Sequence, residues 1–172
     1  TIAAALSGHL DCLQFAHENG CPWDREAVEC AAQEGHLDCL QYCFEHDCSR
    51  DINVYLLAAQ NRHVNCMRYA FEQGLEWDAT VCKVAAMTGN LRCLQFAHVN
   101  NCSWDSETTA GAAQCGQVEC LLYALEHGCP ADKNACKRAC KHNQVVCLHL
   151  LHQFNVPWDV EETFHAVVGS NI

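Results

Sequence analysis

One spacing governs this chain: residues of the same type return every 27 positions. A cysteine, an aspartate and an alanine each keep this period along the whole sequence. The cysteines are Cys12, Cys39, Cys66, Cys93, Cys120 and Cys147; the aspartates are Asp24, Asp51, Asp78, Asp105, Asp132 and Asp159; the alanines are Ala4, Ala31, Ala58, Ala85, Ala112, Ala139 and Ala166. Because three unrelated residue types share one period, the sequence predicts an array of repeats.

The sequence pattern of each repeat predicts two short helices joined by a tight turn. Asp24 is a favoured residue at a helix N-cap, and the apolar residues 27, 28, 31 and 32 that follow it lie on one helical stripe. Gly35 is expected to end this first helix, and residues 37–45 have the apolar spacing of a second helix. The short connections predict antiparallel helices. Since neither helix can bury its apolar stripe alone, the repeats are expected to stack.

The sixteen cysteines could indicate a disulfide scaffold, but the repeat argues against it. Equivalent positions on stacked helices lie about 8–10 Å apart, whereas bridged Cα atoms must lie within about 7 Å. The cysteine ladder that starts at Cys12 is therefore predicted to be reduced and to fill the core of the second helices. Its core neighbours are Leu13, Leu40, Met67, Leu94, Leu121 and Leu148. A reduced chain is expected in an intracellular compartment, with the cytoplasm as the leading candidate.

These segments resemble the ankyrin repeat family. Residues 31–40 match the first part of its pattern, with a double alanine, two variable residues and Gly-His before an aliphatic helix. Residues 18–21 match its end, with cysteine in place of alanine. The family's Thr-Pro-Leu-His signature is absent, so the aspartate caps are expected to replace its hydrogen bonds. The pattern is similar to a cysteine-rich, Pro-Trp-Asp class of the family found in protists, algae and large DNA viruses.

The resemblance implies an all-α fold, an α-solenoid of stacked antiparallel helix pairs. An ordinary ankyrin repeat has about 33 residues, so a period of 27 implies β-hairpin fingers that are shortened or absent. A leucine-rich repeat also has a period of roughly 20–29 residues. We reject it because the Asn or Cys of its pattern never appears. The residues at that position are Glu18, Glu45, Glu72, Val99, Glu126 and Gln153.

The predicted array covers residues 1–172 as a single domain. Complete repeats are expected at 25–51, 52–78, 79–105, 106–132 and 133–159, between partial repeats at 1–24 and 160–172. Neither end resembles a polar capping repeat, so we expect a longer array or a partner that covers the ends.

The charge of the chain limits its partners. A net charge of −11 argues against nucleic acid and against an anionic membrane surface. No apolar run reaches about 18 residues, so direct membrane insertion is not predicted. The one basic cluster is interpreted as a solvated face; it consists of Lys133, Lys137, Arg138 and Lys141.

No residue pattern predicts catalysis, a metal or another cofactor, or a small-molecule substrate. Successive ladder aspartates should lie near 10 Å apart, too far to share a proton. A thiol nucleophile would need a base and a lowered pKa, whereas His9, His36 and His63 occupy the family's structural turn position. Zinc is chemically possible at one group of side chains, but no Cys-x-x-Cys pair supports it. That group is Cys136, Cys140, His142, Cys147, His149 and His152.

Residues that vary while the frame repeats are the candidates for binding. The pair after the double alanine changes from repeat to repeat, and the resemblance implies that it lines a concave face used to bind proteins. The pairs are Gln33 and Glu34, Gln60 and Asn61, Met87 and Thr88, Gln114 and Cys115, and Lys141 and His142. Four loop tryptophans could anchor a partner, although packing between neighbouring repeats is the preferred interpretation. They are Trp23, Trp77, Trp104 and Trp158.

The predicted function is therefore a non-catalytic protein–protein interaction module, acting as an adaptor or scaffold with another protein or protein complex as its partner. The alternative is a structural subunit bound permanently in a larger assembly. A thiol- or metal-handling protein is the third and weakest hypothesis.

Overall fold

The computed structural model describes residues 1–22, 25–48 and 54–159 of the chain. This part of the chain contains twelve α-helices and no strand. The helices are α1 (Ile2–Leu6), α2 (Leu10–Glu18), α3 (Arg25–Glu34), α4 (Leu37–Glu45), α5 (Val54–Gln60), α6 (Val64–Glu72), α7 (Ala79–Met87), α8 (Leu91–Val99), α9 (Ser106–Gln114), α10 (Val118–Glu126), α11 (Lys133–Lys141) and α12 (Val145–Gln153). Each complete repeat expected from the sequence contains one pair of helices.

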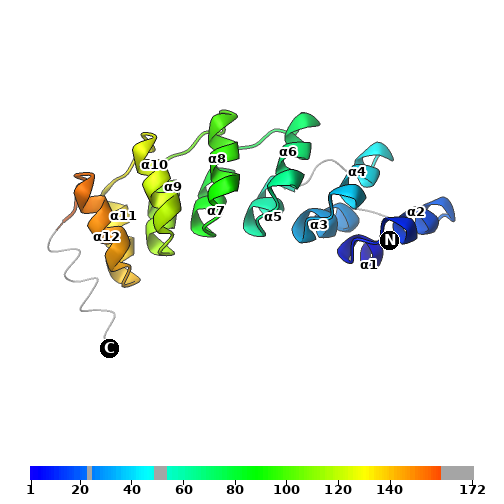
Figure 1. Ribbon diagram of the computed structural model, residues 1–172, viewed down its shortest axis with the longest axis horizontal. Helices are drawn as coiled ribbons and strands as arrows, with labels where there is room; N and C mark the ends of the chain where they lie inside the picture. The colour runs from blue at the N-terminus through cyan, green and yellow to red at the C-terminus, as the bar shows by residue number, and fades with distance from the viewer. Residues whose placement is uncertain (23–24, 49–53, 160–172) are drawn as a thin grey trace. The chain divides into compact units, whose positions relative to one another are not determined.

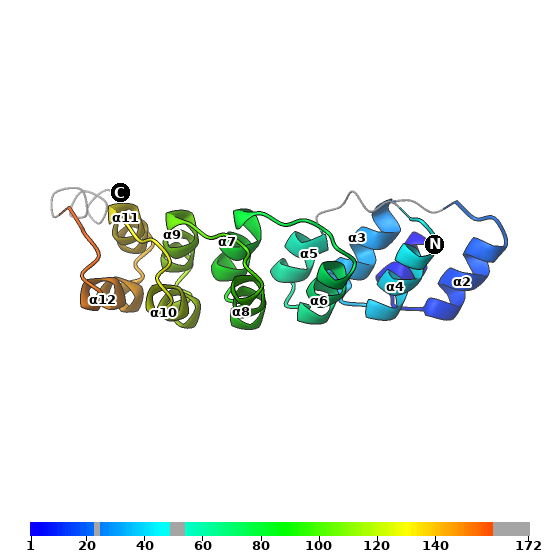
Figure 2. The ribbon, with the colours of Figure 1, turned by 90° about the horizontal axis from the view of Figure 1, so that it is seen from above.

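The helices form two compact units, Thr1–Trp77 and Asp78–Ile172. In the N-terminal unit the first helices of successive repeats, α1, α3 and α5, pack in series, and so do the second helices, α2, α4 and α6. In the C-terminal unit the two series are α7, α9 and α11, and α8, α10 and α12. Figures 1 and 2 show these two rows of helices within each unit. The predicted all-α fold of stacked helix pairs is confirmed.

Aspartate caps start the first helices of the C-terminal unit. The carboxylates of Asp78, Asp105 and Asp132 accept hydrogen bonds from the backbone N–H two residues later, at 2.8, 3.0 and 2.9 Å. These bonds satisfy N–H groups that have no partner inside the helix. The predicted caps at Asp24 and Asp51 lie outside the described residues.

In three repeats, side chains also hold the loop at the end of the repeat in place. The Cys102 thiol donates to the carbonyl oxygen of Asp78 at 3.2 Å, and the Cys129 thiol donates to that of Asp105 at 3.3 Å. From the first helix, the hydroxyls of Tyr55 and Thr109 donate to the loop carbonyls of Leu75 and Pro130, both at 2.8 Å. These bonds hold the loop against the start of the first helix in its own repeat.

In four repeats, the glycine turn between the two helices is covered by the next repeat. Gly8, Gly35, Gly89 and Gly116 have φ between 68° and 79°, a left-handed conformation that glycine adopts without strain. A Cβ atom on any of them would overlap the residue that precedes the next second helix. Those residues are His36, His63, Gln117 and Gln144, in the order of the glycines. The Nε2 atom of the His36 ring also lies 3.2 Å from the carbonyl oxygen of Leu6.

The cysteine ladder lies in the core at five of its six positions. Cys39, Cys66, Cys93, Cys120 and Cys147 are buried, and so are the neighbouring Leu40, Met67, Leu94 and Leu121. The prediction is wrong at Cys12, which is exposed because no described helix packs on that side of α2. It is also wrong at Leu148, which is half-buried, while Leu151 takes the core position in α12.

Candidate binding surface

The first helices bury one stripe and expose the opposite one. In α3 the buried stripe consists of Ala27, Val28, Ala31 and Ala32, and small residues at these positions let neighbouring first helices pack closely. The opposite stripe carries most of the polar side chains of the helix. We call the exposed side of the first helices in each unit the first-helix face.

The ten variable residues predicted for binding lie at the C-terminal ends of the first helices. Six of them are exposed: Gln33, Glu34, Gln60, Asn61, Lys141 and His142. The other four are half-buried: Met87, Thr88, Gln114 and Cys115. The structure therefore makes the pairs accessible at α3, α5 and α11 and less accessible at α7 and α9.

Some of these variable residues bond to their own helix. Asn61 donates to the carbonyl oxygen of Leu57 at 3.0 Å, and the Thr88 hydroxyl donates to that of Val84 at 2.8 Å. Both acceptors lie in the last turn of the helix, where carbonyl groups need partners from outside the helix. Asn61 and Thr88 therefore use part of their hydrogen-bonding capacity inside the chain.

A charged network crosses three first helices of the C-terminal unit. Glu107 of α9 accepts two hydrogen bonds from Arg138 of α11, at 2.8 and 3.1 Å, and forms an ion pair with Lys83 of α7 at 3.1 Å. Hydrogen bonds from Lys83 and then Arg138 lower the pKa of the Glu107 carboxyl, although its partial burial opposes them. The sequence analysis missed this network. Its only signal was that residues 83 and 138 lie close to one repeat length from residue 107.

The side chain of Met87 lies over α9 in the same unit. Gly111 of α9 has no side chain, and a Cβ atom there would overlap the Met87 side chain. Met87 thereby contacts the neighbouring first helix instead of extending fully into solvent. This contact explains why Met87 is half-buried.

The loop tryptophans pack on residues of their own unit. Trp77, Trp104 and Trp158 each contact the ring six positions earlier, with centroids 5.0, 3.9 and 5.8 Å away on Phe71, His98 and His152. Trp104 also meets the ring of Tyr123 in the next repeat at 6.2 Å. Trp77 and Trp104 are half-buried, and Trp158 is 46% exposed. Trp23 lies outside the described residues.

Two histidine–tyrosine–histidine clusters have nearly the same geometry. In the N-terminal unit, His17 Nδ1 lies 2.9 Å from the Tyr42 hydroxyl, and the ring of His46 lies 4.2 Å from that of Tyr42. In the C-terminal unit, His98, Tyr123 and His127 reproduce these contacts at 2.9 and 4.1 Å. Burial, followed by the charge of His127, lowers the pKa of His98 below its ordinary value of 6.5. The sequence analysis did not single out either cluster.

Eleven of the sixteen thiols are buried in the core. All sixteen cysteines lie in the described part of the chain, and none forms a disulfide. Burial raises the pKa of Cys66 and of Cys93 to about 11. A hydrogen bond with Cys102, followed by burial, also raises the pKa of Cys82. Protonated thiols are poor nucleophiles, so these groups are not activated at neutral pH.

The cysteines and histidines suggested for zinc do not converge. Cys136 and Cys147 are buried, whereas His142, His149 and His152 are exposed. His149 lies 3.2 Å from the side-chain nitrogen of Gln153 in the same helix. No group of three or more His, Cys, Asp or Glu side chains in residues 1–22, 25–48 and 54–159 could hold a metal ion.

Comparison with known proteins agrees with the repeat geometry. The sequence pattern of ankyrin repeats, in a three-copy form, matches residues 1–81. Residues 1–81 therefore carry the ankyrin repeat pattern, and the later repeats continue the same 27-residue period. Ankyrin repeats generally act as protein–protein interaction modules and are typically non-catalytic. No curated protein sequence matches this chain.

Solved ankyrin repeat structures share the fold. The human ASB11 ankyrin repeat domain superposes with a TM-score of 0.81 at 18% sequence identity, over 91% of this chain and 83% of that domain. At this identity the likeness concerns the fold alone. None of the helices in the described residues is long and apolar enough to cross a membrane.

Proposed function

We propose that this ankyrin repeat protein is a non-catalytic adaptor or scaffold that presents its first-helix face to another protein. The free, buried thiols support a reducing, intracellular site of action.

The main support for this proposal is that one side of the first helices is buried and uniform, whereas the other side is exposed and variable. Ala31 of α3 and Ala139 of α11 have the same place in the repeat and are both buried, as close packing requires. Two positions later in the repeat, the equivalent residues Gln33 and Lys141 are both exposed. The fold accepts unrelated side chains there, so these positions are available for partner recognition.

Site-specific photocrosslinking tests which face binds. A photoreactive residue would replace Gln33 or Gln60 on the first-helix face, and Glu45 or Glu72 as matched exposed controls on second helices. We expect the same partner to be crosslinked in extracts of the protein's own cells from the two first-helix positions and not from the controls. Crosslinking from the second-helix positions alone would overturn the proposal.

An exposed apolar patch on α12 favours a second function, that of a structural subunit in a larger assembly. Val145 and Val146 are 66% and 64% exposed at the start of this helix. The position of Val146 is occupied by polar residues in the other second helices. A permanent partner covering this patch would purify with the chain at fixed stoichiometry. A chain that purifies alone and stays monodisperse would reject this second function.

A further inference from the structure

Two thiols lie together where a loop packs on the first helix of its own repeat in the C-terminal unit. Cys82 is fully buried on α7, and Cys102, in the loop after α8, is 4% exposed. The Cys82 sulfur lies 3.9 Å from the backbone carbonyl oxygen of Cys102, and the two thiols are hydrogen-bonded to each other. Both residues belong to one repeat, so the contact lies within one compact unit.

No other repeat has cysteine at both of these positions. The two positions are 20 residues apart, and each recurs with the 27-residue period. The corresponding pairs are Thr1 and Cys21, Val28 and Cys48, Tyr55 and Leu75, Thr109 and Cys129, and Cys136 and Val156. In two of these repeats a hydroxyl on the first helix, that of Tyr55 or Thr109, holds the loop by donating to a loop carbonyl. The fold therefore does not require a second thiol at position 82.

Cys102 is placed to react first. It is slightly exposed to solvent, whereas Cys82 is not. The hydrogen bond from Cys82 lowers the pKa of the Cys102 thiol, although burial opposes this shift. Since the thiolate is the reactive form of cysteine, a small oxidant from solvent should meet the more reactive thiol of the pair first.

We propose that Cys82 and Cys102 form a reversible disulfide when the folded chain meets a hydroperoxide such as hydrogen peroxide. The Cys102 thiolate attacks one peroxide oxygen. An S–O bond forms, the O–O bond breaks, and the other oxygen leaves as hydroxide, which takes up the proton released by Cys102. The Cys82 thiol then attacks the Cys102 sulfur. The S–S bond forms, the S–O bond breaks, and the hydroxyl leaves as water with the Cys82 proton. Two thiols are thus oxidised to one disulfide, and the peroxide is reduced to two waters.

The disulfide would replace hydrogen bonds by a covalent link from the loop to α7. The sulfurs have to approach from hydrogen-bond contact to about 2 Å. Cys102 lies outside both α7 and α8, so this approach does not require either helix to distort. The Cys102 thiol would lose its bond to the carbonyl oxygen of Asp78. In a reducing compartment such a disulfide forms transiently and is reduced again, and it does not depend on which face binds a partner.

Disulfide mapping in the folded wild-type chain tests the proposal. The reduced full chain, at low concentration, would be treated with hydrogen peroxide at neutral pH without denaturant. The remaining thiols would be blocked with N-ethylmaleimide, and the peptides identified by mass spectrometry. We expect the Cys82–Cys102 disulfide to be the first to accumulate, and dithiothreitol should restore both thiols.

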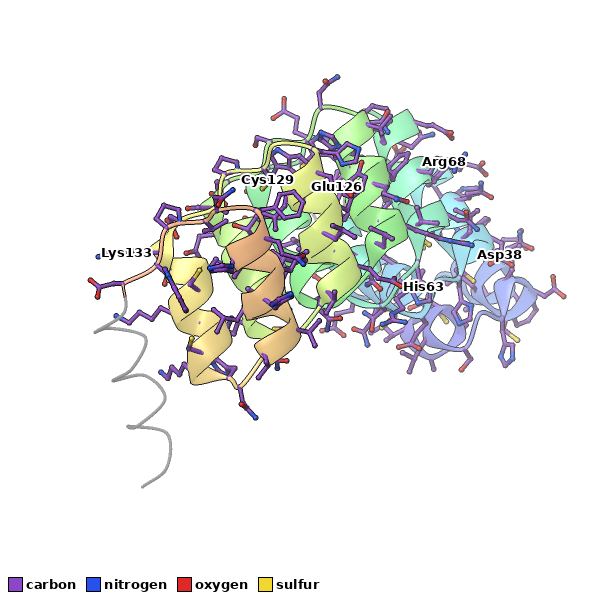
Figure 3. All side chains as sticks on the ribbon, turned by 60° about the vertical axis from the view of Figure 1, so that its left-hand side comes forward. Asp38, His63, Arg68, Glu126, Cys129 and Lys133 are labelled. Atoms are coloured by element: carbon purple, nitrogen blue, oxygen red, sulfur yellow. The ribbon has the colours of Figure 1, made fainter. Side chains whose placement is uncertain are left out.

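Three serine variants separate the roles of the thiols. Cys82→Ser cannot close the disulfide, so dimedone, which reacts with sulfenic acids, should label Cys102. Cys102→Ser should give no label at Cys82. The matched control is Cys129→Ser, which removes the loop cysteine of the next repeat, where Thr109 has the position of Cys82; Figure 3 marks Cys129. This control should form the Cys82–Cys102 disulfide as wild type does.

Oxidation should also stabilise the chain. A disulfide restricts the unfolded state, so peroxide should raise the urea midpoint of wild type and of Cys129→Ser by about 1 M. The midpoint of Cys102→Ser should stay unchanged. Circular dichroism before oxidation should show equal helix content in all of these proteins.

Each of four outcomes would overturn the proposal. The first disulfide could form between Cys43 and Cys48, the hydrogen-bonded thiols of the N-terminal unit. The main product could be a dimer linked through the exposed Cys12 or Cys21. The Cys82–Cys102 disulfide could appear only after urea unfolds the chain, or peroxide could oxidise Cys102 to a sulfinic acid without any disulfide. The wild-type map alone decides among these outcomes, even where a serine variant fails to fold.

Discussion

At the scale of single residues, the contact between Gly35 and His63 is sharply testable. Ala at Gly35 would have to adopt φ near 79°, and its methyl group would overlap the His63 ring. Gly74 has nearly the same φ, 75°, but nothing lies within 4 Å of an added Cβ. We expect Gly74→Ala to lower the free energy of unfolding by about 1–2 kcal/mol through backbone strain alone. Gly35→Ala should lower it by about 1–3 kcal/mol more.

Urea unfolding followed by circular dichroism measures both changes. Removing the ring with His63→Ala should recover part of the loss in Gly35→Ala and none of the loss in Gly74→Ala. Equal decreases in the free energy of unfolding of the two glycine variants would mean that the His63 ring moves aside for the added methyl group at little cost.

A second residue-scale prediction concerns acid sensitivity at His98. Its pKa is lowered in the folded chain, so the unfolded chain binds its proton more readily. The stabilising contribution of neutral His98 should therefore be present at pH 7.5 and be lost as pH falls below about 6.5. His98→Asn removes this titration, and we expect the variant to lose less stability than wild type between pH 7.5 and 5.5.

The urea midpoint at the two pH values gives the comparison. The exposed His149→Asn variant, in the same unit, should behave like wild type. The same pH dependence in wild type and His98→Asn would show that this imidazole does not contribute.

At the scale of helices, the aspartate caps should each stabilise one helix start. The Asp105 carboxylate bonds to the N–H of Glu107 at 3.0 Å, and loss of such a cap costs about 0.5–2 kcal/mol. Asp105→Ala should lower the urea midpoint, while Asp105→Asn, a comparable capping residue, should nearly restore it. Equal losses in Ala and Asn would assign the effect to the charge of Asp105.

Helix positions and ends were the most predictable features of the chain. Asp105 caps a helix start, and Gly35 and Gly116 adopt a left-handed turn. Each residue type favours its role, and the 27-residue period repeats these roles along the chain. The Glu107 network was not predictable, because it depends on how three helices are rotated against each other. The burial of Met87 and the exposure of Cys12 depend likewise on which helices lie beside them.

At the scale of the whole molecule, the buried thiols should make the protein sensitive to alkali. The folded pKa values of Cys66 and Cys93 are about 11, above the ordinary value of 9.0, so the folded chain keeps these protons longer than the unfolded chain. The contribution of these two protonated thiols to the free energy of unfolding should be fully present below pH 9 and should decrease as pH rises from 9 toward 11. Cys66→Val/Cys93→Val should flatten this decrease and, because valine has a similar volume, change stability little at pH 7.

Urea unfolding in the presence of a reducing agent at pH 7 and pH 10 provides the measurement. Equal decreases in wild type and the double variant would show that other groups govern the alkaline transition. A loss beyond about 2 kcal/mol at pH 7 would indicate a special role for one of the two thiols.

The two histidine–tyrosine–histidine clusters also bear on how such a chain can change its length. His17, Tyr42 and His46 are each separated from their counterparts His98, Tyr123 and His127 by 81 residues, which is three repeats. Each cluster draws its side chains from two adjacent repeats, so the duplication of a single repeat would copy only part of it. Duplication of a block that includes both of these repeats would copy the cluster whole, with its contacts already complete. A heritable insertion that copies the cluster must therefore contain at least two repeats, and the separation of 81 residues between the two clusters corresponds to three.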